Sequence, residues 1–254
     1  YKDKETTEVG IIYEKKQKIN GYECTYNYQL QPTAALNYFQ QTSQEQSEQL
    51  GVGPEVLDEM GLAWFLVKYK LQFHEYPKFN DEVILEAVAP AFDKFAAHRR
   101  FAIKSLDGRM MVEGDTEWML QNRKENRLER LSNVPELDVY ESGHENHFKL
   151  KRVAKVEEWT ESKNFQVRYL DIDFNSHVNH VKYLAWALET LPLEKVKAGE
   201  IETAKIIYKN QGFYGDMITV KSAEIDENTY RMDIENQEGI LLCQIEMTMR
   251  IRED

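Results

Sequence analysis

The sequence contains no long run of hydrophobic residues. None of its apolar stretches approaches the ~18 residues that a membrane-spanning helix needs. The chain also opens without the charged and then apolar segment of a secretory signal, although its first residue, Tyr1, leaves a trimmed leader open. These absences predict a soluble protein without a membrane span.

Cysteine and excess positive charge are also scarce. Cys24 and Cys243 are the two cysteines, and neither has metal-ligand spacing around it, which favours a reducing cytoplasm. Against 44 Asp and Glu the chain has 32 Lys and Arg, giving a net charge of −12. Because nucleic-acid-binding proteins concentrate positive charge to neutralise phosphates, this balance argues against a nucleic-acid partner.

Two local clusters of basic residues interrupt the acidic background. They are Arg123, Lys124, Arg127 and Arg130 in NRKENRLER, and Lys149, Lys151, Arg152 and Lys155 in KLKRVAK. Either cluster could bind an acidic surface, although a solvated loop is the simpler interpretation of each cluster alone.

The chain does contain many segments in which apolar and polar residues alternate, as in strands with one buried face. In the second half this pattern predicts a short strand at 165–170, a helix at 181–191, and strands at 203–210, 217–225, 229–236 and 241–251. In the first half it predicts a strand at 21–30, a helix at 32–50 opened by a proline, and strands at 62–73, 81–89, 94–103 and 109–121.

The order of elements is therefore the same in both halves. The segments YPKFNDEVIL and QGFYGDMITV also run alike, and aligning Asp81 with Asp216 gives an offset of 135 residues. This repetition predicts an internal duplication with an α+β fold, in which each unit wraps an antiparallel sheet around a central helix. We expect an N-terminal unit at 1–135, a polar linker at 136–155 and a C-terminal unit at 156–254.

The segment RYLDIDFNSHVNHVKYLAWALETLP, residues 168–192, combines a polar cluster with the start of a predicted helix. A helix N-terminus has free N–H groups and a positive dipole end, which can stabilise developing negative charge. Successive members of the set Asp173, Asn175 and His177 are two positions apart, so an extended loop would place all three side chains on one side. There they could orient and deprotonate a water molecule that attacks an acyl carbon.

Two other interpretations of this cluster remain open. Asp and Asn are ordinary capping residues, and a histidine can tie a loop by hydrogen bonds. Asp171, Asp173, His177 and His180 could also bind a metal ion, although the cluster has none of the familiar zinc or EF-hand spacings. We expect no metal and no cofactor.

The same segment resembles the motif of acyl-acyl-carrier-protein thioesterases, hydrolases that end fatty-acid elongation in plant plastids and in many bacteria. The plant motif reads D-x-D-x-N-x-H-V-N-N-x-x-Y-x-x-W-x-x-E-x-x-P, and the fitting positions are Asp171, Asp173, Asn175, His177, Val178, Asn179, Tyr183, Trp186, Glu189 and Pro192. His180 replaces the second asparagine of the pair. The resemblance extends over almost the whole chain, with further similar positions at Trp64, Tyr76, Pro77, Arg100 and Trp118.

The resemblance implies a double hot-dog fold, of the bacterial oleoyl or medium-chain type, and a set of site residues. Asp173 would be the carboxylate base or nucleophile, and Asn175 and His177 would position and polarise the reacting groups. The family's glutamate is replaced by Gln211, 34 residues after His177, and Gly212 stands where some plant members have a cysteine. A cysteine nucleophile therefore cannot operate at 212, whereas the Gln211 amide could orient water or donate to the thioester oxygen.

The implied reaction is hydrolysis of fatty acyl-acyl-carrier-protein in a bacterial cytoplasm. The implied partner is acyl carrier protein with its acyl-phosphopantetheine, and a homodimer is possible. An acyl-coenzyme A thioesterase and a non-catalytic acyl-binding protein are the alternatives. Trp64, Phe65 and Phe39 are candidates to line an acyl channel, and the KLKRVAK cluster is the first candidate to guide the carrier arm.

Overall fold

The computed structural model describes residues 11–142 and 148–252. The strands of these residues are β1 Ile12–Lys18, β2 Leu62–Phe73, β3 Glu82–Phe92, β4 Ala96–Ser105, β5 Met110–Asn122, β6 Arg127–Leu128, β7 Glu161–Gln166, β8 Gly199–Tyr208, β9 Met217–Asp226, β10 Thr229–Glu235 and β11 Leu241–Ile251. The α-helices are α1 Pro32–Gln49, α2 Pro54–Glu59, α3 His180–Leu188 and α4 Leu193–Ala198.

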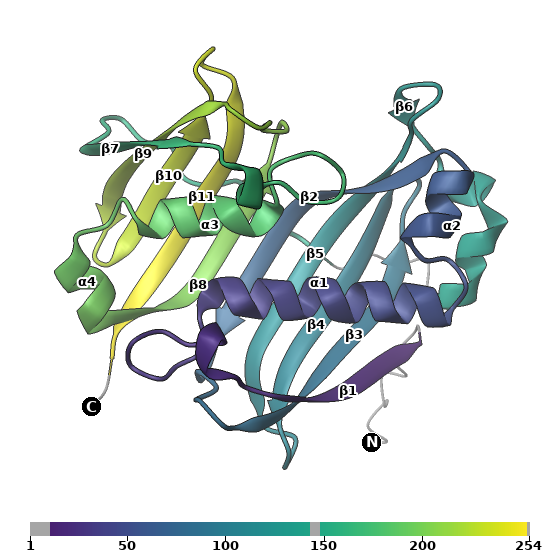
Figure 1. Ribbon diagram of the computed structural model, residues 1–254, viewed down its shortest axis with the longest axis horizontal. Helices are drawn as coiled ribbons and strands as arrows, with labels where there is room; N and C mark the ends of the chain where they lie inside the picture. Colours follow the sequence, from purple (N-terminus) through teal and green to yellow (C-terminus); the bar gives the residue numbers. More distant parts are fainter. Residues whose placement is uncertain (1–10, 143–147, 253–254) are drawn as a thin grey trace, which may run out of the picture.

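All of these strands belong to one continuous sheet. Its order is β1-β3-β4-β5-β2-β8-β11-β10-β9-β7, with β6 paired to β5. The first half of the chain supplies one side of the sheet and the second half the other, and β2 and β8 join them as an antiparallel pair. Helices α1 and α3 lie over the same face (Figure 1). The architecture is the predicted α+β fold of two tandem hot-dog units.

Helix α1 packs closely on its sheet because a glycine lies beneath it. The ring of Phe39, fully buried, stacks on Phe101 at 5.1 Å between centroids. A Cβ atom on Gly114 of β5 would lie only 3.0 Å from the Phe39 ring. The bare backbone at Gly114 therefore lets the helix approach the sheet, and Phe39 belongs to the core.

The predicted duplication is visible in equivalent backbone contacts. Before β3, the Asp81 carboxylate accepts the Lys78 N–H at 2.8 Å, and before β9 the Asp216 carboxylate accepts the Phe213 N–H at 2.9 Å. The Asp81 carbonyl oxygen accepts the N–H of Ile19, just after β1, at 2.9 Å. The Asp216 carbonyl oxygen accepts the N–H of Val167, just after β7, also at 2.9 Å. The alignment of Asp81 with Asp216 therefore joins structurally equivalent residues.

Three element predictions were wrong or inaccurate. Residues 21–30 do not form a strand: they contain a 3₁₀ turn, Gly21–Glu23, and a loop with exposed tyrosines, whereas the first strand is the lysine-rich β1. Pattern reasoning missed β1 because an edge strand exposes every second residue and needs few apolar ones. The strand predicted at 165–170 ends at Gln166, and the helix predicted at 181–191 ends at Leu188.

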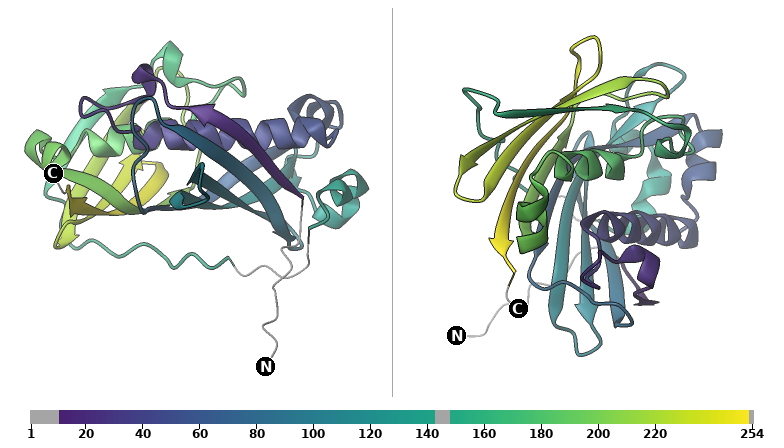
Figure 2. Two further views of the ribbon diagram at one scale, coloured as in Figure 1. Left: turned by 90° about the horizontal axis from the view of Figure 1, so that it is seen from below. Right: turned by 60° about the vertical axis from the view of Figure 1, so that its left-hand side comes forward.

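The segment between the halves is only partly described. A 3₁₀ helix at Pro135–Tyr140 buries Leu137 and Tyr140 in a hydrophobic cluster of the first half. Residues 143–147 of the expected linker lie outside the described residues, as do residues 1–10 of the expected first unit. Residues 148–156 have no regular secondary structure and run along the sheet face opposite the helices (Figure 2). The boundaries at 135 and 155 stay a prediction.

Within residues 11–142 and 148–252, no helix is long and apolar enough to cross a membrane.

Candidate active site

Residues 173–177 form a tight turn, not the extended loop expected from their alternation. The Asp173 N–H donates to the His177 carbonyl oxygen at 2.9 Å, and Ser176 adopts a positive φ of 66°. The Asp173 carboxylate accepts the backbone N–H of Asn175 at 2.8 Å. Of the four predicted catalytic residues, Asp173, Asn175 and His177 therefore come together because the chain closes on itself.

Asn179 and Asp171 anchor this turn at its two ends. Asn179 caps helix α3, its side-chain oxygen accepting the Val181 N–H at 3.1 Å. Asp171 is completely buried and ion-paired with Arg168 at 3.1 Å and Lys182 at 3.2 Å. Burial alone would raise the pKa of Asp171, but the hydrogen bonds from Arg168 and Lys182 outweigh it and lower the pKa. The capping interpretation is thus correct for Asn179, and Asp171 stabilises the loop.

His177 has the environment of a neutral imidazole. Its ring meets the Phe213 ring edge to face at 5.3 Å between centroids. Burial lowers the pKa of His177 below 6.5, the nearby Asp173 charge opposes that effect, and the Arg123 charge adds to it. An imidazole that is neutral at pH 7 can accept a proton from water or from a nucleophile.

Asn175 is held by an arginine that sequence reasoning did not assign to the site. Its Oδ1 accepts a hydrogen bond from Arg123 Nη2 at 3.0 Å. The same guanidinium pairs through Nη1 with Asp58 of α2 at 2.8 Å. Arg123 was recognised only as a member of a basic cluster, because it is 52 residues from Asn175 along the chain.

Gln211 lies beside the turn because the next residue is fixed by two hydrogen bonds. Gly212 accepts the Val178 N–H at 2.9 Å and donates its own N–H to the Tyr183 hydroxyl at 3.2 Å. A Cβ atom on Gly212 would lie 3.0 Å from the Val178 side chain and 3.2 Å from the Tyr183 hydroxyl. The larger side chain of cysteine would therefore force these neighbours to move.

A cavity of about 380 Å³ opens next to the turn. It lies between α1, α2 and the strands of the first half, and its lining includes Trp64, Trp118 and Leu57 as well as Phe174 and Asn175 of the second half. Of the three predicted channel residues, Trp64 lines this cavity, Phe65 does not, and Phe39 is part of the core. The cavity thus belongs to the first unit and the adjacent turn to the second.

Neither cysteine is suited to act as a nucleophile. Cys243 is fully buried in β11, and burial raises the pKa of its thiol well above the usual value. Burial also raises the pKa of Cys24, which lies in the first half. A thiol with a raised pKa is poor in reactive thiolate at neutral pH.

The polar cluster does not form a metal site. Within residues 11–142 and 148–252, no three or more His, Cys, Asp or Glu side chains are grouped so that they could hold a metal ion. Asp171 is engaged by its two cations, and His180 lies between the rings of Tyr69 and Tyr208, at centroid distances of 6.5 and 6.1 Å.

His180 should make folding stability depend on pH. Burial lowers its pKa to about 4, so the unfolded chain binds this proton more tightly than the folded chain does. Stability contributed by the neutral ring is therefore complete above pH 6.5 and is lost as pH falls towards 4. We expect this residue to lower the free energy of unfolding by about 2 kcal/mol between pH 7 and pH 5.

Urea unfolding at the two pH values should show that loss in the wild type and a smaller one in His180→Asn. The exposed His74→Asn is the control, and equal losses in all three proteins would contradict the prediction.

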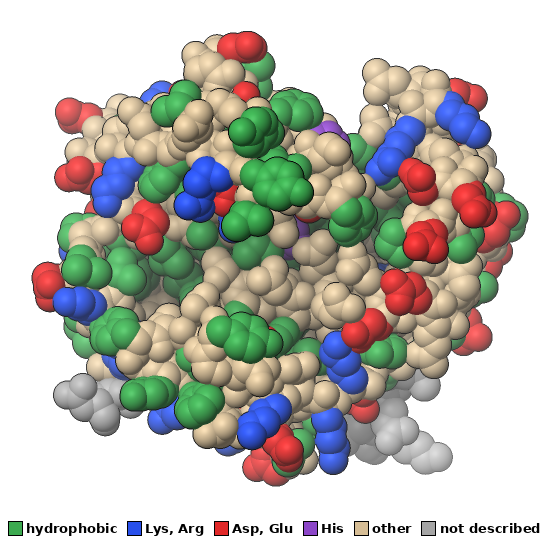
Figure 3. Space-filling view, viewed as in Figure 1, with side chains coloured by type: hydrophobic (Ala, Val, Ile, Leu, Met, Phe, Trp, Pro, Cys, Tyr) green, Lys and Arg blue, Asp and Glu red, His purple; other side chains and the backbone are tan. Residues whose placement is uncertain are grey.

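The surface around the turn is unusually apolar. Tyr169, Leu170, Phe174 and Tyr214 are each between 69% and 80% exposed. In the space-filling view, hydrophobic side chains gather over the loops beside α3, whereas acidic side chains gather over α2 (Figure 3). Contiguous exposed apolar surface of this kind marks an interaction site more often than chance.

Comparison with known proteins finds acyl-ACP thioesterases both among family models and among single proteins. The acyl-ACP thioesterase N-terminal domain model matches residues 10–139, and the C-terminal domain model matches residues 154–250. The chain is 24% identical over 242 residues to the chloroplastic oleoyl-acyl carrier protein thioesterase of Coriandrum sativum, covering 88% of this chain and 66% of the relative. It is 24% identical to the chloroplastic palmitoyl-acyl carrier protein thioesterase of Cuphea hookeriana, covering 80% of this chain and 52% of the relative. The chain thus spans less than two thirds of these curated relatives.

Solved structures show the same fold over nearly the whole chain. A crystal structure assigned as an oleoyl thioesterase from Lactobacillus plantarum superposes with a TM-score of 0.89 at 24% identity, covering 96% of this chain and 98% of the other. An acyl-ACP thioesterase from Bacteroides thetaiotaomicron superposes with a TM-score of 0.85 at 18% identity, covering 94% and 98%. Since its two domain models together account for most of its residues, the chain belongs to the acyl-ACP thioesterase family.

Proposed function

We propose that the protein hydrolyses the thioester of fatty acyl-acyl-carrier-protein and releases free fatty acid. The observation that carries this proposal is that Asn175 belongs both to the turn with Asp173 and His177 and to the lining of the 380 Å³ cavity. A thioester bound at the turn could therefore extend its acyl chain past Trp64 and Trp118. Family membership and the named substrates of the relatives support the same reaction.

The catalytic roles follow from the chemistry of each group. Asp173 is the carboxylate that activates water or attacks the thioester, and the neutral His177 shares the transferred proton. The Asn175 amide donates to the thioester oxygen as negative charge develops there. Gln211 has no basic group, so its amide orients the attacking water. This scheme needs no cysteine, in agreement with the buried Cys243.

We place the path of the carrier arm past Arg123 and not past the KLKRVAK cluster. Arg123 contacts the turn directly, whereas the segment containing Lys149 and Lys151 runs along the opposite face of the sheet (Figure 2). There the Ala154 N–H is bound by Glu246 at 2.7 Å. We therefore reverse the expectation from the sequence, which put the KLKRVAK cluster before the cluster that contains Arg123.

The test is release of free fatty acid from a panel of acyl-carrier-protein substrates of different chain length and saturation. Matched acyl-coenzyme A esters should be run beside them, because both carriers present the same phosphopantetheine thioester. Faster release from the carrier-protein substrates is the expected result. Faster release from coenzyme A esters would favour the alternative thioesterase, and binding without release would favour an acyl-binding protein.

Gln211 should contribute to turnover through its amide. We expect Gln211→Ala to lower kcat about tenfold, since the attacking water loses one of its hydrogen-bond partners. Gln211→Glu, which restores the family residue, should retain activity because a carboxylate also accepts a hydrogen bond from water. Steady-state kinetics on the best panel substrate measure both variants. Wild-type turnover in Gln211→Ala would remove Gln211 from the mechanism.

A cytoplasmic location and a homodimer stay predictions. The free thiols of Cys24 and Cys243 are compatible with a reducing compartment. Sedimentation equilibrium would determine the oligomeric state.

A further inference from the structure

The Arg123 guanidinium connects the cavity wall to the catalytic turn. One nitrogen binds Asp58 of α2, at 2.8 Å, and another binds the side chain of Asn175, at 3.0 Å. A guanidinium only donates hydrogen bonds, so the Asn175 atom that faces it must be the amide oxygen. The amide nitrogen, with its two hydrogens, is thereby directed away from Arg123.

We propose that Arg123 is a positioning residue for thioester hydrolysis: by binding the Asn175 oxygen it presents the Asn175 NH₂ group to the substrate carbonyl. This inference rests on the proposed function. A freely rotating asparagine could present either its oxygen or its nitrogen to the substrate, and only the nitrogen stabilises an oxyanion. The Asp173 carboxylate fixes the backbone of Asn175 at 2.8 Å, and Arg123 fixes its side chain.

Arg123 also acts on the second functional group of the turn. Its positive charge lowers the pKa of His177, the Asp173 charge opposes this effect, and burial is the largest contribution. The arginine therefore has two consequences at one site, a correctly oriented amide and a neutral imidazole. A substitution that removed only packing would produce neither change.

The first unit contains a copy of this arrangement without the catalytic side chains. The loop of that unit closes with the same backbone bonds, from the Thr25 N–H to the Gln29 oxygen at 2.8 Å and from the Tyr28 N–H to the Thr25 oxygen at 3.0 Å. Tyr28 has a φ of 63°, close to the 66° of Ser176. Thr25 and Gln29 therefore occupy the places of Asp173 and His177, and neither can act as a general base at neutral pH.

Arg252 is the counterpart of Arg123 in this copy. Arg123 directly follows β5 and Arg252 directly follows β11. Each donates its backbone N–H to the residue before the equivalent strand, Arg123 to Gly61 before β2 at 2.8 Å and Arg252 to Ala198 before β8 at 2.9 Å. With the Asn27 amide oxygen turned towards Arg252, that oxygen lies 2.9 Å from Nη1. Asn27 takes the place of Asn175 in the copied loop.

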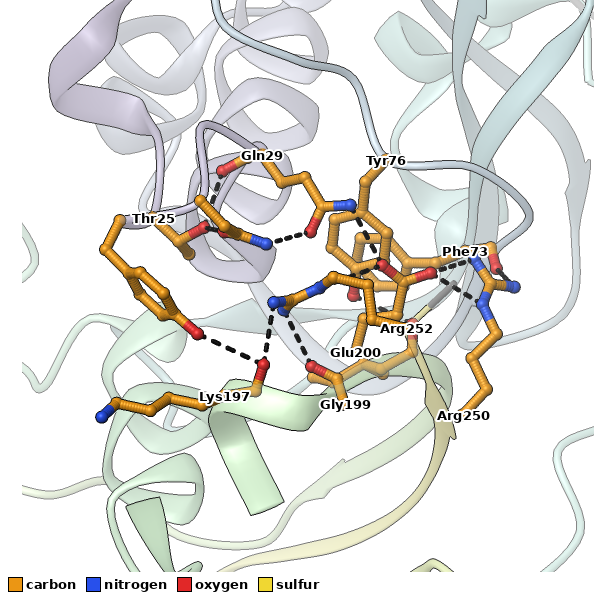
Figure 4. A network of polar contacts seen from close by, with 12 residues as sticks. Thr25, Gln29, Phe73, Tyr76, Lys197, Gly199, Glu200, Arg250 and Arg252 are labelled. Carbon is orange, nitrogen blue, oxygen red and sulfur yellow. Dashed lines mark hydrogen bonds and ion pairs between the residues drawn. The ribbon is translucent and has the colours of Figure 1, made fainter. Parts of the chain in front are cut away.

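The copied site is filled by hydrogen bonds of Arg252 within its own unit and by a hydrogen bond between the two units. Arg252 donates to the backbone oxygens of Lys197 at 2.8 Å and Gly199 at 3.0 Å, and the Gln29 amide reaches Glu200 at 3.2 Å (Figure 4). The same arginine position thus has a purely structural role in one unit. Arg252 is therefore a matched control for Arg123.

The experiment compares wild type, Arg123→Gln, Arg123→Lys and Arg252→Gln in fatty acid release across a range of pH. We expect Arg123→Gln to lower kcat about ten- to a hundredfold with little change in KM, because a transition-state donor is misplaced. The acid limb of its pH profile should move to higher pH, since the charge that lowers the pKa of His177 is lost. Arg123→Lys should restore the acid limb, and Arg252→Gln should keep the wild-type kcat and pH profile below its Tm.

A second readout does not depend on turnover. The ring signals of His177, followed by NMR from pH 4 to pH 8, should titrate at higher pH in Arg123→Gln than in wild type or Arg252→Gln. If Arg123→Gln changed neither kcat nor the His177 titration, the positioning role would be overturned. The same holds if Arg123→Gln and Arg252→Gln both lose activity only in proportion to their fall in Tm. A wild type that releases no fatty acid from any substrate would instead contradict the proposed function.

Discussion

Asp173→Asn should lower fatty acid release by at least about a hundredfold while leaving the protein folded. The substitution removes the only carboxylate of the 173–177 turn, and loss of a general base costs roughly 10²- to 10⁴-fold in rate. The asparagine keeps an oxygen that can still accept the Asn175 N–H, bound at 2.8 Å in the wild type. The local fold is therefore preserved, and the measured change reports chemistry.

His177→Ala should cause a loss of similar size. Within the described parts of the chain no hydrogen bond ties the His177 ring, so its removal costs little stability beyond the contact with Phe213. Burial lowers the pKa of His177, so as pH falls the wild-type protein should lose its activity at a lower pH than a histidine with the ordinary pKa of 6.5 would give. Kinetics on the best panel substrate, with circular dichroism of each variant, measure the effects. Wild-type turnover in both variants would rule out the proposed mechanism.

Asp171→Ala should have the largest effect on stability. This carboxylate is completely buried, and it accepts hydrogen bonds from the Arg168 backbone N–H at 2.9 Å, from the Arg168 side chain and from Lys182. Its removal leaves the Arg168 N–H without this acceptor, breaks both ion pairs and releases the turn that precedes α3. We expect a loss of about 2 to 4 kcal/mol in the free energy of unfolding.

Urea unfolding of Asp171→Ala and Asp173→Asn separates the two aspartates of the motif. The pKa of Asp171 is lowered from 3.8, so its contribution is complete at neutral pH and should be lost only in strong acid. At pH 7 the Asp171 variant should be clearly destabilised and the Asp173 variant close to wild type. Equal stability of the two variants would mean that the ion pairs of the buried Asp171 do not hold the loop.

Sequence reasoning was most accurate for elements whose pattern arises from burial on one face. The bounds of β2 and β11 were predicted at 62–73 and 241–251, as observed, because their apolar residues face the helices. Strand β1 was missed because it is an edge strand whose residues are mostly Lys, Glu and Gln. Its pairing with β3 supplies the stabilisation that its composition does not indicate.

The candidate site was predicted in its residues but not in its geometry. Asp173, Asn175 and His177 were chosen for their spacing, yet they meet because a hydrogen-bonded turn joins Asp173 to His177. Arg123 could not be found from spacing, since only the pairing of the two half-sheets brings the end of β5 next to the turn. A long-range contact of this kind has no periodic signal in the sequence.

The two outer strands of the sheet determine how molecules of this protein can meet one another. β1 reads IYEKKQK and β7 reads ESKNFQ, so among residues 11–142 and 148–252 both outer strands of the sheet have charged side chains. Adding a strand from a second molecule would strip these charged side chains of water. The charged edges therefore oppose end-to-end growth of the sheet into fibres and favour a face of the molecule over an edge for self-association.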